Sequence, residues 1–404
     1  MPKTIQQTAT TVLHGAEAPR RAGAPVSSAI TAATSFYADP ASIGFSGNDL
    51  GADAPSFYTR WGNPTVAELE GRLTLLEGGA GAVAFGSGMA AISSLWLSVL
   101  SAGDHLVISD VCYAGAAELA HDILPRFGIT VSRVDTSDLA AVKAALQAGK
   151  TKLIHVETPA NPTLRLADIA GIATLAREAG AQVSVDSTIA TPIATQPIAL
   201  GADYVVHSMT KYICGHGDAL GGIVVAAKAG DLAALRNGAL IHHGAALSPF
   251  AAWLILRGLE TLPARMRVHE ENARVLATFL QGHPAVAKVH WPGLADHPQA
   301  ELAKRQMKNF SGLLSFTLKD GAASAALALR MHHEFEVISY AVSLGKTKSL
   351  MFYIPTDDIL SSSFHPTPKA EAAYREAAGA GVFRFSVGIE DAQDLIRDLQ
   401  KVLG

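Results

Sequence analysis

The sequence has only two cysteines, Cys112 and Cys214, among its 404 residues. So few thiols argue against a disulfide framework and fit a reducing compartment. Charge is also sparse: 17% of the residues are charged, the formal net charge is −4, and no basic stripe is visible. This composition argues against nucleic acid as a partner.

Long apolar runs are absent as well. The stretch 249–256 is apolar but short, and Arg257 closes it, so a buried helix is the simpler interpretation. Residues 1–15 lack the apolar core of a signal peptide, and the histidine pairs at 242–243 and 332–333 lack the spacing of metal ligands. We therefore expect a cytoplasmic globular protein with no membrane partner and no metal. Its 49% hydrophobic residues allow two domains.

Residues 1 to about 60 show no sustained periodicity and are rich in Gly, Ala, Pro, Ser and Thr. A segment of that length without regular elements is typically disordered or functional. A helical pattern follows over residues 65–76, where apolar side chains recur at helical spacing. Residues 1–62 are therefore interpreted as an arm that precedes the folded domains.

Short β-rich runs alternate with helical stretches through the middle of the chain. The predicted strands are residues 82–85, 105–109, 130–134, 153–157, 182–186, 204–207 and 222–226. These runs are almost entirely apolar, which is typical of strands buried on both faces. The alternation predicts an α/β fold with a large, mostly parallel seven-stranded sheet covered by helices.

The rest of the chain has a different pattern. We expect a long helix over 258–280, strands at 313–318 and 382–387, and a closing amphipathic helix over 392–403. This pattern predicts a smaller C-terminal α+β domain. The expected division is an arm (1–62), a large domain (63–256) and a small domain (257–404).

Five of the predicted strands end in a glycine turn or in polar and aromatic groups. In chain order these are Gly86-Ser87-Gly88-Met89, Cys112-Tyr113, Thr158-Pro159-Ala160-Asn161-Pro162, Asp186-Ser187-Thr188 and Ser208-Met209-Thr210-Lys211. In open α/β sheets, ligands bind beyond the carboxyl ends of the strands. We therefore expect these groups to share one site.

The chemistry of this set matches one cofactor. A glycine turn that opens a helix offers N–H groups to a phosphate, and Ser208 and Thr210 could add hydroxyl groups. Lys211 could condense with an aldehyde. Asp186 could pair with a pyridinium nitrogen and Tyr113 could stack on the ring. The combination predicts pyridoxal 5′-phosphate (PLP) held as a Schiff base on Lys211.

A dinucleotide site is the main rival interpretation. Residues 86–91 fit the pattern G-x-G-x-x-A, and Asp110 ends the next strand at about the right spacing. An NAD-dependent Rossmann dehydrogenase would leave Asp186 and Lys211 unexplained. It would also place the fingerprint behind a long irregular segment, so we rank it well below the PLP enzyme.

Further runs along the chain occur in a characteristic order. They are Tyr58-Thr59-Arg60-Trp61-Gly62-Asn63-Pro64-Thr65, Gly86-Ser87-Gly88-Met89-Ala90-Ala91, Thr158-Pro159-Ala160-Asn161-Pro162, His207-Ser208-Met209-Thr210-Lys211-Tyr212, Ser343-Leu344-Gly345 and Arg384-Phe385-Ser386-Val387-Gly388. Together they resemble the Cys/Met-metabolism family of PLP-dependent enzymes, which includes cystathionine γ-synthase, cystathionine and methionine γ-lyases and O-acetylhomoserine sulfhydrylase. The resemblance covers nearly the whole chain and implies fold type I of the PLP-dependent transferases.

The resemblance also implies a role for each matching residue. Lys211 would hold the cofactor and move protons between substrate carbons, Asp186 would pair with the pyridine nitrogen, and Tyr113 would stack on the ring. The cofactor's other contacts would be Gly88, Met89, Thr188, Ser208 and Thr210, joined by Tyr58 and Arg60 of a neighbouring subunit. Asn161 and Arg384 would bind the substrate carboxylate, Ser343 would steady Lys211, and Tyr58 would help the leaving group depart.

Two features of the residues support part of this assignment independently. An arm without its own core is well suited to reach across a dimer. In the strand at 382–387, the period of two puts Phe383 and Phe385 on one face and Arg384 on the other, where its fork suits a carboxylate. We expect a homo-oligomer with active sites shared between subunits, and the resemblance suggests a homotetramer arranged as a dimer of dimers.

The chain departs from the family around residues 346–358. Lys346-Thr347-Lys348 replaces a run that usually contains Gly and an acidic residue. Ala116 stands where methionine γ-lyases commonly carry Cys, and Val342 where cystathionine-handling members often have Glu. The altered loop suggests a leaving group other than a simple thiol: Asp357 and Asp358 could offer a carboxylate to a cationic group, so canavanine is a candidate substrate. An equally good interpretation is that both aspartates are exposed loop charges.

The predicted activity is that of a γ-lyase, which performs γ-elimination or γ-replacement on a homoserine-type amino acid such as methionine, cystathionine or canavanine. The alternatives are cystathionine γ-synthase or O-acetylhomoserine sulfhydrylase activity, and a β-lyase that acts on cystathionine. A PLP-binding regulatory protein is the non-enzyme alternative, and the complete set of implied catalytic residues argues against it.

Overall fold

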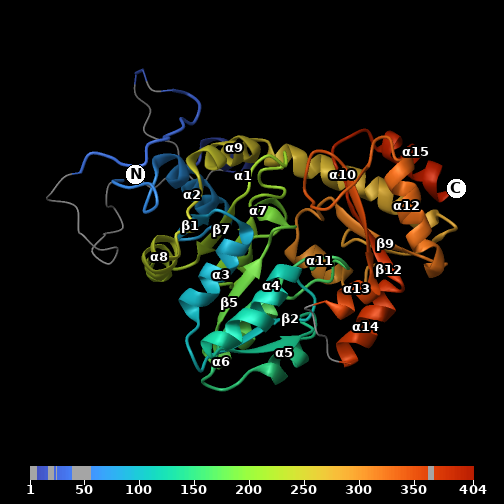
Figure 1. Ribbon diagram of the computed structural model, residues 1–404, viewed down its shortest axis with the longest axis horizontal. Coiled ribbons are helices and arrows are strands. Elements are labelled where there is room, and N and C mark those ends of the chain that lie inside the picture. The colour runs from blue at the N-terminus through green and yellow to red at the C-terminus, as the bar shows by residue number, and fades with distance from the viewer. Residues whose placement is uncertain (1–6, 17–21, 24, 39–55, 363–367) are drawn as a thin grey trace.

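A computed structural model describes residues 7–16, 22–23, 25–38, 56–362 and 368–404 (Figure 1). Its large sheet contains β1 (Gly81–Phe85), β2 (His105–Ser109), β3 (Thr130–Val134), β4 (Thr151–Glu157), β5 (Gln182–Asp186), β6 (Tyr204–Ser208) and β7 (Gly222–Ala226). The strand order is β1-β7-β6-β5-β4-β2-β3. All neighbouring pairs are parallel except those of β7, which runs antiparallel to β1 and β6. The predicted mostly parallel, seven-stranded sheet is confirmed.

Helices cover both faces of this sheet. They are α2 (Pro64–Glu77), α3 (Gly88–Val99), α4 (Ala114–Glu118), α5 (Leu139–Ala145), α6 (Ile169–Ala179), α7 (Thr191–Ala194), α8 (Ile241–His243) and α9 (Pro249–Glu260). Successive residues of β4 show the reason: Leu153 packs in the cluster that contains Trp96 of α3, whereas Ile154 packs in the cluster that contains Ile172 of α6. A strand with apolar side chains on both faces needs a layer on each side.

A second, five-stranded sheet lies on the C-terminal side of the molecule (Figure 1). Its strands are β8 (Val286–His290), β9 (Leu313–Leu318), β10 (Ser339–Tyr340), β11 (Leu350–Pro355) and β12 (Gly381–Ser386), in the order β10-β11-β12-β9-β8. The accompanying helices are α10 (Leu262–Gly282), α11 (Ala300–Gln306), α12 (Ser324–Glu334), α13 (Thr356–Ser361), α14 (Pro368–Ala378) and α15 (Ala392–Leu403). The predicted strand at 313–318 and the closing helix at 392–403 are confirmed.

Two expectations about helices are wrong. The long helix expected over 258–280 is two helices, because α9 ends at Glu260 and α10 begins at Leu262. Pro263 lies in the first turn of α10, where a missing N–H is tolerated, but it could not continue the interior of α9. The N-terminal arm is also not free of regular structure, because α1 (Thr8–His14) forms and buries Val12. The arm residues 1–6, 17–21, 24 and 39–55 lie outside the described residues.

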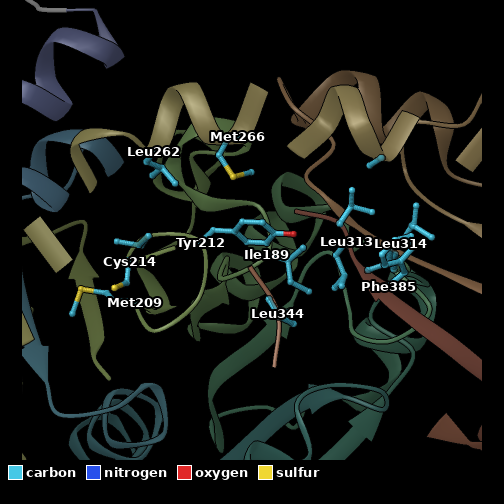
Figure 2. Packing of buried hydrophobic residues seen from close by; sticks show 14 of the residues in the cluster. Ile189, Met209, Tyr212, Cys214, Leu262, Met266, Leu313, Leu314, Leu344 and Phe385 are labelled. Carbon is cyan, nitrogen blue, oxygen red and sulfur yellow. The ribbon is translucent and has the colours of Figure 1, made fainter. Parts of the chain in front are cut away.

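One hydrophobic cluster joins the two sheets (Figure 2). It contains Met209 and Tyr212 from the segment after β6, Met266 from α10, and Leu313 and Phe385 from the second sheet. The segment that carries Lys211 is therefore held between the sheets by buried side chains on both sides. The predicted boundaries at residues 62 and 256 remain a prediction. No helix in the described part of the chain combines the length and apolarity that crossing a bilayer requires.

Candidate cofactor and substrate site

The turn before α3 forms a cradle for an anion. Ser87 caps the helix by accepting a hydrogen bond from the N–H of Ala90 at 3.1 Å. The N–H groups of Gly88 and Met89, in the first turn, have no acceptor inside the helix. A Cβ on Gly88 would lie 2.8 Å from the Cβ of Ser208. Only glycine therefore lets the helix start approach the end of β6 so closely, and the cradle has the N–H groups and the room that a phosphate needs.

Asp186 ends β5 and is buried beside this cradle. Its Oδ1 accepts a hydrogen bond from the N–H of Thr188 at 3.0 Å, and the Oγ1 of Thr188 accepts one from the N–H of Ser208 at 2.8 Å. Burial raises the pKa of Asp186, while the Thr188 hydrogen bonds and His207 act in the opposite direction. A buried carboxylate with so little water is stabilised by a cation, which is what a protonated pyridine nitrogen would supply.

Lys211 lies in the turn after β6, between the two sheets. Its Nζ donates a hydrogen bond to the Oγ of Ser343 at 3.2 Å. Burial lowers the pKa of Lys211, and the positive charges of Arg384 and Lys346 lower it further. A lowered pKa increases the share of neutral amine, which is the form that attacks an aldehyde and removes a proton. Ser343 has a φ of +87°, a left-handed conformation that non-glycine residues rarely adopt.

Arg384 brings the second sheet into the site. Its Nη1 donates to the Oδ1 of Asn161 at 3.3 Å, and its Nη2 donates to the main-chain oxygen of Ser343 at 3.1 Å. Ser315 lies opposite Arg384 on β9 and donates to the main-chain oxygen of Pro162 at 2.8 Å. The two sheets are thus joined at the loop that carries Asn161. Phe383 and Phe385 point into the core, so the predicted alternation along this strand is confirmed.

Glu157 was missed by the sequence reasoning. It ends β4, lies next to Asp186 in the sheet, and is buried. Its Oε2 accepts from the N–H of Tyr113 at 2.6 Å, and its Oε1 accepts from the N–H of Asn161 at 2.8 Å. Burial raises its pKa to about 8, and Asp186 adds to the shift. The signal that could have found it is a lone acidic residue at the end of an apolar strand, directly before the loop of Asn161.

Tyr113 and Thr210 occupy the rim of the site. Tyr113 is the N-cap of α4 and its side chain is half-exposed. A Cβ on Gly115 would contact both the Tyr113 ring and the Sδ of Met89, so the ring lies near the start of α3. The Oγ1 of Thr210 accepts from the N–H of Gly221 at 3.1 Å and donates to its oxygen at 3.4 Å. The contact implied between Thr210 and the phosphate therefore stays a prediction.

Tyr58 and Arg60 lie elsewhere in this chain. The guanidinium of Arg60 donates to the main-chain oxygen of Ile241 in α8 and lies 5.4 Å from the centre of the Tyr58 ring. This place is at the edge of the molecule, far to the left of the second sheet in Figure 1. No contact between described residues joins either side chain to Lys211. Their implied role across a subunit boundary stays a prediction.

The acidic groups proposed for a cationic leaving group are directed to solvent. Asp357 lies in the first turn of α13, its side chain is 82% exposed, and its Oδ1 lies 2.8 Å from the Nη1 of Arg375. Asp358 is also exposed. Asp110, the acidic partner in the dinucleotide alternative, forms an ion pair with Arg165. Neither arrangement leaves a free carboxylate beside Lys211.

Comparison with known proteins agrees with this geometry. The profile of the family described as Cys/Met metabolism PLP-dependent enzyme matches residues 9–404. The L-methionine gamma-lyase of Pseudomonas putida is 41% identical over 87% of this chain and 86% of its own. The canavanine gamma-lyase of Pseudomonas canavaninivorans is 38% identical over 98% of this chain and 96% of its own. The crystal structure of cystathionine gamma synthase from Xanthomonas oryzae pv. oryzae in complex with cystathionine has a TM-score of 0.86, at 37% identity over 98% of each chain.

Proposed function

Because the chain belongs to the family of Cys/Met metabolism PLP-dependent enzymes, we propose that it is a γ-lyase. It would release the γ-substituent of a homoserine-type amino acid, with methionine as the first candidate. The observation that carries this proposal is the contact of Lys211 with Ser343, whose main-chain oxygen binds Arg384. The Lys211 amine, which can move protons, thus lies near the Arg384 guanidinium, which suits the carboxylate of an amino acid.

The residues fit the cofactor that the family requires. The phosphate would lie against Gly88 and Met89, the ring nitrogen against Asp186, and the aldehyde carbon at Lys211. PLP, when bound, supplies an electron sink for the electrons that remain on the substrate when protons leave its carbons.

Arg384 and Asn161 would hold the substrate carboxylate. An arginine has five N–H donors in a planar fork, and Arg384 uses two of its nitrogens on Asn161 and Ser343. These contacts hold the guanidinium in place before the substrate arrives, which lowers the entropic cost of binding. Anchored there, the amino acid would present its Cα–H to the Nζ of Lys211.

Lys211 would carry the protons of the reaction. Its neutral Nζ would take the proton from Cα and give that proton up to the bound cofactor and substrate, so that the amine is neutral again and can take a second proton from Cβ, after which the γ-substituent can leave. The hydrogen bond from Nζ to the Oγ of Ser343 orients the amine between these positions. The departing group needs a proton donor, and Tyr58 of a neighbouring subunit would fill that role. The active unit would then be at least a dimer.

The charges around the site favour a neutral leaving group. Lys346 lies beside Gly217, where an added Cβ would be 2.8 Å from its Nζ, and its charge acts on Lys211. A cationic leaving group would therefore meet positive charge. Because Asp357 and Asp358 are exposed, they do not offset it, so we place canavanine after methionine. γ-Replacement, as in cystathionine γ-synthase or O-acetylhomoserine sulfhydrylase, would use the same residues.

A product assay separates these substrates. The purified enzyme with PLP is incubated separately with methionine, cystathionine, canavanine, and O-acetylhomoserine with and without a thiol, and products are identified by mass spectrometry. Release of a 2-keto acid and a thiol from methionine is the expected result. Turnover of canavanine alone would overturn the choice of leaving group. Turnover that depends on the added thiol would show that the enzyme is a synthase.

A further inference from the structure

We propose that Glu157 is a positioning residue that holds the ring-stacking Tyr113 and the carboxylate-binding Asn161 in register. This inference rests on the proposed roles of those two residues. Tyr113 follows β2 and Asn161 follows β4, so they belong to separate loops at the same edge of the large sheet. One carboxylate connects both loops.

The two hydrogen bonds are direct and are shielded from water. Tyr113 donates its N–H to the Oε2 of Glu157 at 2.6 Å, and Asn161 donates its N–H to the Oε1 at 2.8 Å. Glu157 is 7% exposed. Its own N–H lies 3.4 Å from the Oγ of Ser109 on β2, so its main chain is also tied to the neighbouring strand. A shift of either loop would leave a buried N–H or a carboxylate oxygen without a partner.

The two oxygens of an ionised carboxylate can serve both loops. Each of its oxygens accepts a hydrogen bond, whereas an amide has one accepting oxygen and an NH₂ group that donates. A glutamine at this position would therefore point a donor at one of the two N–H groups. Burial raises the pKa of Glu157, and repulsion from Asp186 adds to the shift. A cation held against Asp186 would reduce that repulsion, so a bound cofactor would favour the ionised form.

Arg384 connects this contact to the substrate. Its charge stabilises the Glu157 carboxylate, and its Nη1 donates to the side chain of Asn161. Asn161 is therefore held from two directions, through its main chain by Glu157 and through its side chain by Arg384. Losing the contact with Glu157 would free the loop that carries Asn161. Arg384 alone would then hold the substrate carboxylate, so the substrate would bind more weakly.

The test compares Glu157→Gln with a matched control, Asp398→Asn. Asp398 is also a buried carboxylate, and it accepts hydrogen bonds from the N–H groups of Glu336, Val337 and Ile338. It lies in α15, and none of its contacts is with a proposed site residue. Both variants lose a buried acceptor, so both should be less stable, but only Glu157→Gln should affect ligand binding.

Two binding constants are measured on the purified enzyme, and neither requires turnover. They are the dissociation constants of PLP and of glycine, and both are followed through the absorbance of the cofactor. Glycine is chosen because it has no γ-substituent to lose. Glu157→Gln should weaken glycine binding about 10- to 100-fold, as expected for the loss of a buried hydrogen bond to a charged group. Asp398→Asn should bind both ligands like the wild type.

A double variant shows whether Glu157 acts through Asn161. Glu157→Gln combined with Asn161→Ala should weaken glycine binding little more than Asn161→Ala does, because Glu157 would act on glycine through the Asn161 side chain, which Asn161→Ala has already removed. Additive effects, unchanged PLP and glycine binding in Glu157→Gln, or equal weakening by Asp398→Asn would overturn the inference. If Glu157→Gln does not fold, Glu157→Asp, which keeps the charge but is too short to reach both loops, takes its place.

The lyase proposal can be refuted independently of the positioning role of Glu157. A wild-type enzyme that binds glycine but releases no keto acid from any γ-substituted amino acid would refute the lyase proposal. The comparison of Glu157→Gln with Asp398→Asn would still be decisive for the positioning role.

Discussion

Replacing Gly88 with alanine tests whether the turn before α3 is shaped for a phosphate. The added Cβ would lie 2.8 Å from the Cβ of Ser208, 3.0 Å from its Oγ and 3.2 Å from its Cα. Carbon atoms in contact normally lie roughly 3.5–4.0 Å apart. The helix start and the end of β6 would therefore have to separate by roughly 0.7 Å or more. Overpacking of this kind costs about 1–3 kcal/mol of the free energy of unfolding.

We expect Gly88→Ala to lower the stability of the PLP-free protein by that amount and to raise the dissociation constant of PLP about tenfold or more. The second effect follows because the N–H groups of Gly88 and Met89 would move away from the phosphate. Denaturant unfolding measures the first quantity and equilibrium dialysis the second.

Two further variants control this experiment. Gly282→Ala, at the end of α10, adds a Cβ that meets nothing within 4 Å, so it should leave PLP binding unchanged. Ser208→Gly in the Gly88→Ala background removes the colliding Cβ and Oγ and should restore part of the lost stability. Wild-type stability and PLP affinity in Gly88→Ala would refute the reasoning that only glycine permits this close approach.

Three other changes test the charges of the site. Lys346→Met should raise the pKa of Lys211, because it removes a neighbouring positive charge. The neutral amine then appears only at higher pH, so the pH at which PLP attachment accelerates, followed by absorbance, should move upward; no movement would contradict the influence of Lys346. Arg384→Lys keeps the charge but loses the fork that binds Asn161 and Ser343, so KM for the amino acid should rise about 10- to 100-fold, with a smaller change in kcat. Asp357→Asn should leave substrate preference unchanged. It should also change the free energy of unfolding by no more than about 1 kcal/mol, because the ion pair of Asp357 with Arg375 is exposed. A changed ratio of canavanine to methionine turnover in this variant would instead place Asp357 at the site.

The strands were the part of the fold that could be predicted most closely. The predicted ranges 105–109, 130–134, 182–186 and 222–226 match β2, β3, β5 and β7. These are short apolar runs between polar turns, and burial on both faces leaves few alternatives. The helices were less certain, because the pattern over 258–280 continues through the break at Thr261. Hydrophobic periodicity does not register a one-residue break when the helices on both sides of it bury apolar side chains.

Part of the site could be predicted because ligands bind beyond the carboxyl ends of the strands in open α/β sheets. Gly88, Asp186, Ser208 and Lys211 were expected at one edge of the large sheet, and the structure places them there. Ser343 and Arg384 could not be reached in this way, because Arg384 belongs to the second sheet and Ser343 to the segment between two of its strands. Only the family resemblance suggested them. Glu157 was overlooked because its importance lies in two main-chain N–H groups, which no side-chain motif marks.

The order of apolar runs and turns along the chain was sufficient to predict the large sheet, the edge at which its ligands bind and the residues suited to PLP. These are local properties, set by the period of burial and by what stands at each strand end. The meeting of Lys211 with Ser343 and Arg384, and of Glu157 with Tyr113 and Asn161, depends on how two sheets and three loops pack. The contacts of Lys211 with Ser343 and of Glu157 with Tyr113 join residues far apart in the chain, so they and the pKa shifts that burial causes arise only in the folded protein.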